Sequence, residues 1–176
     1  MACTSPSIRR RARALSALAL LTGVPFAAPA HAADRPVDAS KLWATVNVCD
    51  TAAHPNAIGL RASMPGSGNP ADELFMRFQV QYFSPKDGLW HGLANGGDSG
   101  FLDVGSGRQK VREAGRFFVL APVADGASFQ LRGVVSFEWR RGGIAYRSLR
   151  RRTTPKHVSS AGADPPGFSA AICTLS

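Results

Sequence analysis

Apolar residues occupy every second position in two long segments of the chain, residues 74–83 and 131–140, and the intervening residues are polar or mixed. Successive side chains of a β-strand point to opposite faces, so this period of two predicts two long strands, each with one apolar face. We expect these faces to meet in a hydrophobic core. The large side chains expected in that core are Trp43, Phe78, Val80, Val135, Phe137 and Trp139.

Shorter apolar segments predict further strands, and clusters of Gly, Pro, Asn and Asp separate them. No segment carries a clear helical period, although residues 110–115 could form one helical turn. Regularly spaced short strands with such turns favour an all-β chain, folded as a single antiparallel β-sandwich or as an open barrel. The shorter predicted strands are residues 42–49, 57–64, 116–120, 144–152 and 170–174, with weaker patterns at 89–93 and 101–104.

Two consecutive glycines at residues 142–143 are typical of a two-residue hairpin loop between the strands on either side. With this loop, Trp139 faces Tyr146 and Glu138 faces Arg147. An aromatic pair and an opposite-charge pair each stabilise a hairpin by ~0.2–1 kcal/mol. The chemistry of the opposed residues therefore supports this register.

The first 32 residues have the three parts of a secretory signal peptide. Four arginines lie within residues 9–13, an apolar stretch covers residues 14–28, and small residues at 30 and 32 fit a signal peptidase site. We expect cleavage after Ala32, which leaves residues 33–176 as one exported domain. The consecutive arginines leave both the Sec and the twin-arginine route open.

A membrane-anchoring or amphipathic helix is the alternative for this N-terminal segment. Two prolines, Pro25 and Pro29, interrupt the apolar stretch and argue against a helix. No stretch of the chain reaches the ~20 apolar residues of a membrane-spanning helix, so we expect no transmembrane span.

Removal of residues 1–32 changes both the charge and the cysteine count. Four of the 21 Lys and Arg residues leave with this segment and none of the 12 Asp and Glu residues do, so the net charge falls from +9 to +5. Of three cysteines, Cys49 and Cys173 remain. An even count in an exported chain predicts a disulfide bond between them, with two buried free thiols as the alternative.

The whole positive excess of the exported chain lies in the segment 140–156, which contains no acidic residue. Such a segment attracts polyanions through long-range electrostatics, so we expect it to be a polyanion-binding surface. The alternative is that charges on an edge strand prevent aggregation between sheet edges. The residues of the expected surface are Arg140, Arg141, Arg147, Arg150, Arg151, Arg152 and Lys156.

Two short fragments are similar to the active-site motifs of trypsin-like serine proteases. Thr51-Ala52-Ala53-His54 matches the surroundings of the catalytic histidine, and Gly97-Asp98-Ser99-Gly100 matches those of the serine. That family places the two residues on separate β-barrels. The 45 residues between His54 and Ser99 cannot contain the rest of one barrel, the acid and the start of the next.

Metal and cofactor chemistry also lacks support in the sequence, and we expect no cofactor and no catalytic residues. The histidines have no metal-ligand spacing, and no Cys-x-x-Cys pair is present. Asp98 and Asp103 lie in a glycine-rich stretch, but their spacing fits no calcium-binding loop. The three glutamates have simple surface interpretations, so no pair of catalytic carboxylates is evident.

The exported part of the chain resembles small secreted proteins of unknown function from high-GC, actinobacteria-like bacteria. Residues 42–51, 55–66 and 131–139 carry this resemblance. It implies an immunoglobulin-like β-sandwich but brings no activity. The wide spacing of the two cysteines departs from the immunoglobulin pattern, in which the bridge joins two middle strands.

From these observations we expect an exported, non-enzymatic binding or structural module. Its expected partner is an anionic cell-wall polymer, bound by the basic segment, or another extracellular protein. A small secreted hydrolase with an unrecognised site and a protein-binding inhibitor or adhesion module are the alternatives. An enzyme would require a polar cleft with coupled titratable groups.

Overall fold

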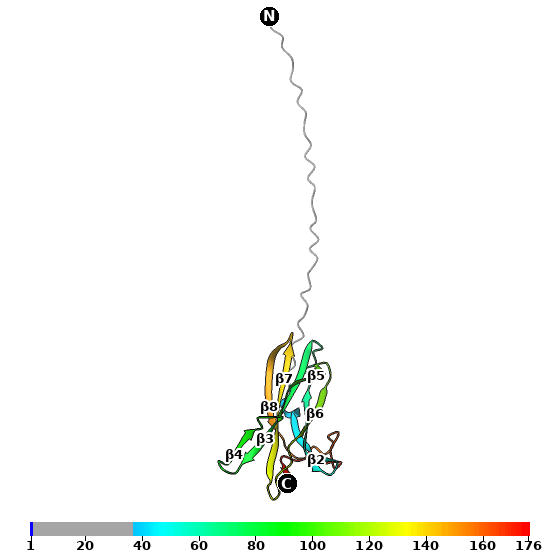
Figure 1. The fold of residues 1–176 in the computed structure, drawn as a ribbon. Coiled ribbons are helices and arrows are strands. Elements are labelled where there is room, and N and C mark those ends of the chain that lie inside the picture. The colour runs from blue at the N-terminus through cyan, green and yellow to red at the C-terminus, as the bar shows by residue number, and fades with distance from the viewer. Residues whose placement is uncertain (2–36) are drawn as a thin grey trace. The chain divides into compact units, whose positions relative to one another are not determined.

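The computed structural model describes Met1 and residues 37–176, and its contacts divide the chain into Met1–Ala32 and Ala33–Ser176. Apart from Met1, the predicted signal peptide and its cleavage site lie outside the described residues. The second unit is all-β, with its strands paired antiparallel (Figure 1). A short 3-10 helix, η1 (Ala39–Lys41), precedes the first strand.

A three-stranded sheet has the order β1-β2-β6. Its strands are β1 (Trp43–Thr51), β2 (His54–Pro65) and β6 (Val111–Val119). The segment after residue 152 covers the free edge of β1, because the amide of Thr154 donates to the carbonyl of Ala44 at 2.8 Å and Val46 exchanges backbone hydrogen bonds with Ala170. The long connection between residues 152 and 173 is therefore held against this sheet.

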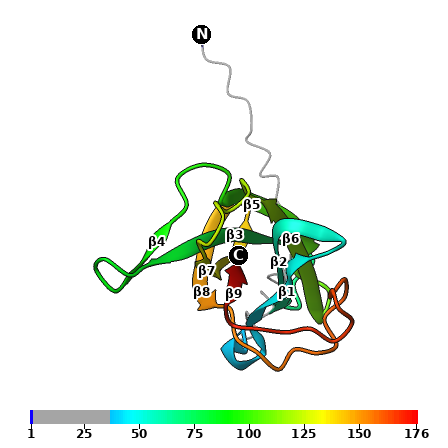
Figure 2. The ribbon, with the colours of Figure 1, turned by 60° about the horizontal axis from the view of Figure 1, so that its bottom comes forward.

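A six-stranded sheet is built around two long strands, β3 (Asp72–Ser84) and β7 (Phe129–Arg141), which pair with each other along most of their length. β4 (Leu89–Gly92) and β5 (Asp98–Ser106) pair with the other edge of β3. β8 (Ile144–Arg152) and β9 (Cys173–Leu175) pair with the other edge of β7. Figure 2 shows the hairpin of β3 and β4 projecting from the body of the fold.

Side chains from both sheets share one hydrophobic core. The period of two in the sequence is confirmed here, since Phe78, Val80, Val135, Phe137 and Trp139 are all at most 1% exposed. The prediction that Trp43, at the start of β1, lies in the core is wrong. This tryptophan is half-buried and stacks on the ring of residue 157 at a centroid distance of 4.5 Å, outside the core.

The hairpin of β7 and β8 turns at residues 142–143 as predicted, but its register is correct only next to the turn. A β-bulge between the pairs of Arg140 and Trp139 leaves Tyr146 without a partner, so Trp139 lies opposite Arg147. The expected pairs of Trp139 with Tyr146 and of Glu138 with Arg147 are therefore wrong. The hydroxyl of Tyr146 donates instead to the carboxylate of Asp72.

The helical turn that residues 110–115 could form is absent, because residues 111–115 belong to strand β6. Its residues pair with β2 in an unbroken antiparallel register from Val111 to Val119. Pairing with β2 satisfies the backbone amides and carbonyls on one side of this segment, which an isolated helical turn would leave exposed.

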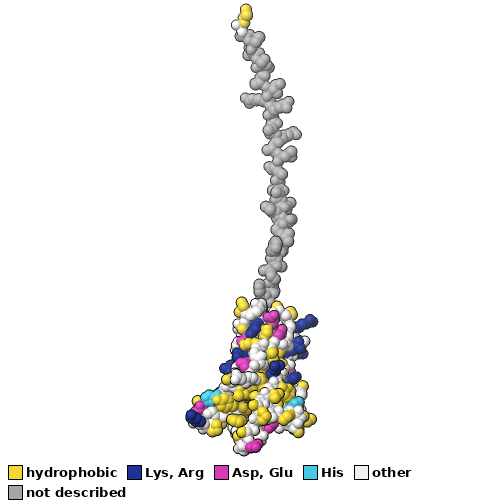
Figure 3. Space-filling view, in the orientation of Figure 1, with side chains coloured by type: hydrophobic (Ala, Val, Ile, Leu, Met, Phe, Trp, Pro, Cys, Tyr) yellow, Lys and Arg dark blue, Asp and Glu magenta, His cyan; other side chains and the backbone are white. Residues whose placement is uncertain are grey.

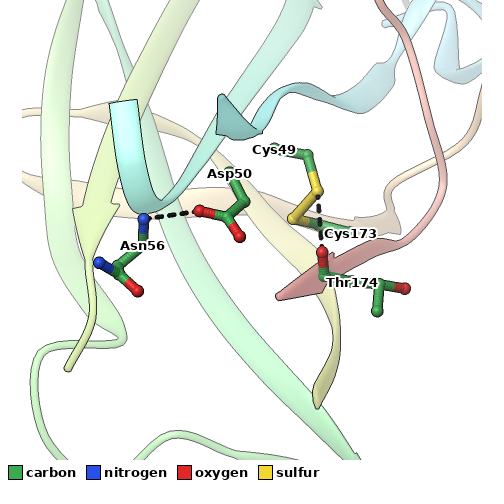
Figure 4. The surroundings of a disulfide bond; sticks show 5 residues. All are labelled: Cys49, Asp50, Asn56, Cys173 and Thr174. Carbon is green, nitrogen blue, oxygen red and sulfur yellow. Dashed lines mark hydrogen bonds between the residues drawn. A yellow bond between two sulfur atoms is a disulfide. The ribbon is translucent and has the colours of Figure 1, made fainter. Parts of the chain in front are cut away.

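A disulfide bond joins Cys49 of β1 to Cys173 of β9 (Figure 4). The two Cα atoms are 5.4 Å apart, and 124 positions separate the residues in the chain. Because β1 belongs to one sheet and β9 to the other, the bond links the two sheets at the C-terminal end of the chain. The structure thus contains the disulfide that the cysteine count predicts.

Candidate functional site

Three guanidinium groups share the outer face of the six-stranded sheet where β8 ends. Val134 of β7 pairs with Arg152, and two residues earlier Arg150 lies on the same face of β8. Arg132, two residues before Val134, also lies on this face because side chains alternate along a strand. Arg151 lies between the two on β8 and starts from the opposite face, beside Val135, but it also borders the cavity described below; we call these four residues the arginine cluster.

Arg132 is held in place by two neighbours across the sheet. Its Nε donates to the side-chain oxygen of Gln81 on β3 at 2.8 Å. Its guanidinium lies over the ring of Trp90 on β4, 4.3 Å from the ring centroid. A hydrogen bond and a cation–π contact therefore fix the orientation of this side chain before any ligand arrives.

The arginine cluster surrounds a shallow cavity of about 280 Å³. No described carboxylate forms an ion pair with any of the four arginines. Burial lowers the pKa of Arg132, and the positive charge of Arg152 lowers it further. The guanidinium of Arg151 donates to the carbonyls of Arg150 and Ala39, each at 3.1 Å. The cavity is therefore a concave, uncompensated positive site lined by Gln81, Arg132, Val134, Arg150, Arg151 and Arg152.

The basic residues nearer the β7–β8 turn have a different environment. Arg140 forms an ion pair with Glu138 at 2.6 Å, and Arg141 forms one with Asp72 at 2.7 Å. Arg147 lies over the ring of Trp139, with its guanidinium carbon 5.9 Å from the centroid. Near the turn, Arg140 and Arg141 are therefore neutralised by carboxylates and Arg147 packs on an aromatic ring, whereas the cluster at the end of β8 is uncompensated.

Lys156 belongs to neither part of this surface. It follows β8 in the loop that covers β1, and its backbone has a positive φ of 79°. It does not line the cavity of the arginine cluster.

The two fragments similar to serine proteases lie on different sheets, with His54 on β2 and Ser99 on β5. The ring of His54 contacts Phe117 at 5.0 Å. The hydroxyl of Ser99 donates to the carbonyl of Gly100 and accepts from the amide of Phe78. Among the described residues no hydrogen bond joins the histidine to the serine, so this pair lacks the geometry of a catalytic dyad.

The aspartates of the glycine-rich stretch are engaged by other groups. Hydrogen bonds from Arg77 lower the pKa of Asp98 to about 2 despite partial burial, and Asp103 accepts from the amide of Gly105 at 2.7 Å. Within residues 37–176 no group of three or more His, Cys, Asp and Glu side chains is placed to hold a metal ion. The same part of the chain contains no helix with the length and hydropathy of a membrane span.

Sequence reasoning missed Arg132, Gln81 and Trp90. Arg132 lies outside the basic segment by sequence, and only the pairing of β7 with β8 brings it beside Arg150 and Arg152. The alternation along residues 131–140 does place Arg132 on the polar face of its strand. The order of the strands in the sheet was the missing information.

Comparison with known proteins identifies no family. No family model matches the chain, and no curated protein matches it. Among solved structures, a match is found to the Pseudomonas fluorescens alkylpurine DNA glycosylase AlkC bound to DNA containing an abasic site analog. The match has 15% sequence identity and a TM-score of 0.26, and it covers 63% of this chain and 28% of the glycosylase chain.

Proposed function

We propose that residues 33–176 are an exported, non-enzymatic module that binds polyanions through the arginine cluster. The observation that carries this proposal is the position of Arg132. Charges on β8 alone would be explained by protection of a sheet edge. Arg132 lies on β7 opposite Gln81 of β3, and on its other side the flanking residues Leu131 and Gly133 are bonded to β9 and to Thr153, so edge protection gives no reason for its charge.

The chemistry of the cavity favours ligands with repeated anionic groups. Guanidinium groups bind phosphates and carboxylates through parallel hydrogen bonds, and they retain their charge at all physiological pH values. A cavity of about 280 Å³ admits one such group, while the exposed residues on the outer face of β8 leave room for the rest of the polymer chain. Anionic cell-wall polymers have this chemistry, and they lie where an exported protein would meet them.

Export itself is part of the proposal. A disulfide bond persists in oxidising compartments outside the cytoplasm, and the bond between Cys49 and Cys173 agrees with such a location. The N-terminal sequence supports cleavage after Ala32, by either export route. We further propose that the two sheets form an immunoglobulin-like β-sandwich, as the resemblance to small secreted proteins of high-GC bacteria implies.

The test is co-sedimentation of the protein with isolated bacterial cell walls over a series of salt concentrations. The cluster variant combines Arg150→Gln, Arg151→Gln and Arg152→Gln, and a separate variant carries Arg132→Gln. The control variant removes the same charge from exposed positions outside the cluster. Its substitutions are Arg108→Gln, Lys110→Gln and Arg116→Gln.

We expect the unmodified protein to bind at low salt and to be released as salt screens the charges. The cluster variant and Arg132→Gln should lose binding, and the control variant should retain most of it. Equal loss in the cluster and control variants would show that net charge alone drives binding, which contradicts a defined site. If the unmodified protein does not bind at low salt, the arginines protect the edge of β8, and a protein partner becomes the leading alternative.

A further inference from the structure

A second cavity, of about 600 Å³, lies at one end of the core and is almost entirely apolar. We call it the apolar pocket. Its floor contains Leu131 and Leu175, each 2% exposed, so the pocket is continuous with the hydrophobic core. The other lining residues are Tyr82, Leu93, Asn95, Leu120, Ala121, Pro122, Val123, Ala124, Ala127 and Phe129.

One wall of the pocket is the connection between β6 and β7, residues 120–128. Surface connections are usually polar, but this one begins with five consecutive apolar residues. Leu120 and Val123 pack against the core, and Phe129 at the start of β7 remains 48% exposed. Figure 3 shows hydrophobic side chains gathered over the lower part of the described body, where Figure 1 places the beginning of β7.

Two polar side chains line the pocket, and no charged side chain does. They belong to Tyr82, which is half-buried, and Asn95, which is exposed, and neither makes a side-chain hydrogen bond to any described residue. Pockets for small molecules have this composition, with volumes of about 300–1,000 Å³, apolar walls and a few polar groups that orient the ligand.

We propose that the apolar pocket binds a neutral small molecule with an apolar body and one hydrogen-bonding end. Absence of charged lining residues selects against an ionised ligand, because the pocket would remove its hydration without supplying a counter-ion. The hydroxyl of Tyr82 and the amide of Asn95 supply both donors and acceptors for an alcohol, amide or ester end. A concave site of this size suits a small molecule, whereas a stable protein interface needs about 1,000 Å² or more.

This inference is independent of polyanion binding. Tyr82 and Leu131 line the apolar pocket, and their chain neighbours Gln81 and Arg132 line the cavity of the arginine cluster. Neighbouring residues of a strand point to opposite faces, so the two cavities lie on opposite sides of the same sheet. Variants of the arginine cluster should therefore leave the apolar pocket intact.

The test titrates the full chain with three probes of equal chain length: 1-octanol, octanoate and octylammonium. Isothermal titration calorimetry and NMR chemical-shift changes report binding. We expect saturable binding of 1-octanol, at least tenfold tighter than that of either ion, with shifts in residues 120–128. Ala127→Trp fills the pocket from its half-buried wall and should weaken octanol binding at least tenfold.

Ala145→Trp is the matched control, because it adds the same side chain at an exposed position of β8. It should bind octanol as the unmodified chain does, and so should the cluster variant of the arginines. Val123→Glu is the second test variant if Ala127→Trp fails to fold. Failure of octanol to bind saturably below its solubility limit, equal affinity for all three probes, or unchanged affinity in a folded test variant would each overturn the proposal.

Discussion

Removal of the disulfide bond is the perturbation whose magnitude follows most directly from the structure. The variant is the double substitution Cys49→Ala and Cys173→Ala. Alanine is preferable to serine because the side chain of Cys173 is fully buried, and a serine hydroxyl there would add a separate desolvation cost. The double variant therefore avoids that cost, and the void left by the buried sulfur of Cys173 adds a smaller cost to the loss of the covalent link.

Loop-closure entropy sets the size of the expected effect. The bond joins residues 124 positions apart, and closing a loop of this length lowers the free energy of folding by about 5 kcal/mol in the chain-entropy model. The native strand pairs of β9 with β7 need not change, so the effect acts on the unfolded chain. Domains of this size are stable by about 5–15 kcal/mol, so the loss is a large share of the total.

Urea denaturation of the unmodified protein and the double variant measures this difference by linear extrapolation. We expect a loss of about 5 kcal/mol, and a melting temperature lower by roughly 15–20 °C. The unmodified protein treated with reductant is the control, and it should approach the variant. A loss below about 1 kcal/mol would refute the loop-closure reasoning.

Three further predictions concern the buried carboxylate of Asp72, the tyrosine beside it and one tight glycine. Burial opposes ionisation of Asp72, but hydrogen bonds led by Arg141 outweigh burial and lower the pKa of this carboxyl. Asp72→Asn should lower the free energy of unfolding, measured by urea denaturation, by roughly 1.5–3 kcal/mol. The stabilisation that the ionised Asp72 gives to the unmodified protein should fade as pH falls below 3.8. Burial and the hydrogen bond to Asp72 raise the pKa of Tyr146 to about 12. The melting temperature should therefore fall as pH rises from 10 to 12, and that of Tyr146→Phe should not show this fall. A Cβ on Gly133 would lie 2.7 Å from Leu60, so Gly133→Ala should cost about 1–3 kcal/mol by urea denaturation.

The two long strands were predictable because a buried sheet face leaves a period of two in the sequence. The same alternation does not reveal a bulge, and the extra residue Tyr146 shifted every pair beyond Arg140. Residues 110–115 show a related limit. Their pattern is weak because β6 is an edge strand with several exposed side chains, so pairing with β2 decides the structure.

The charge cluster was only partly predictable for a similar reason. Density of arginine along the chain identified Arg150–Arg152, but density cannot show which charges are neutralised by residues distant in sequence. Arg141 meets Asp72 across 69 positions of sequence, while Arg132 joins the cluster from another strand. The pairing of the strands therefore shows that Asp72 neutralises Arg141 and that Arg132 belongs to the arginine cluster.

The same two strands carry both proposed binding sites, and this has a consequence for how the sites relate. Gln81 and Arg132 face one side of the central pair β3 and β7, and Tyr82 and Leu131 face the other. Both strands pair with neighbours on each side, so their backbones are fixed by hydrogen bonds along most of their length. Side chains on such strands are positioned before a ligand binds, which lowers the entropy cost of binding. The two sites can therefore act on opposite faces of one rigid support, and any adjustment to a ligand of the apolar pocket falls to the connection 120–128 rather than to β3 and β7.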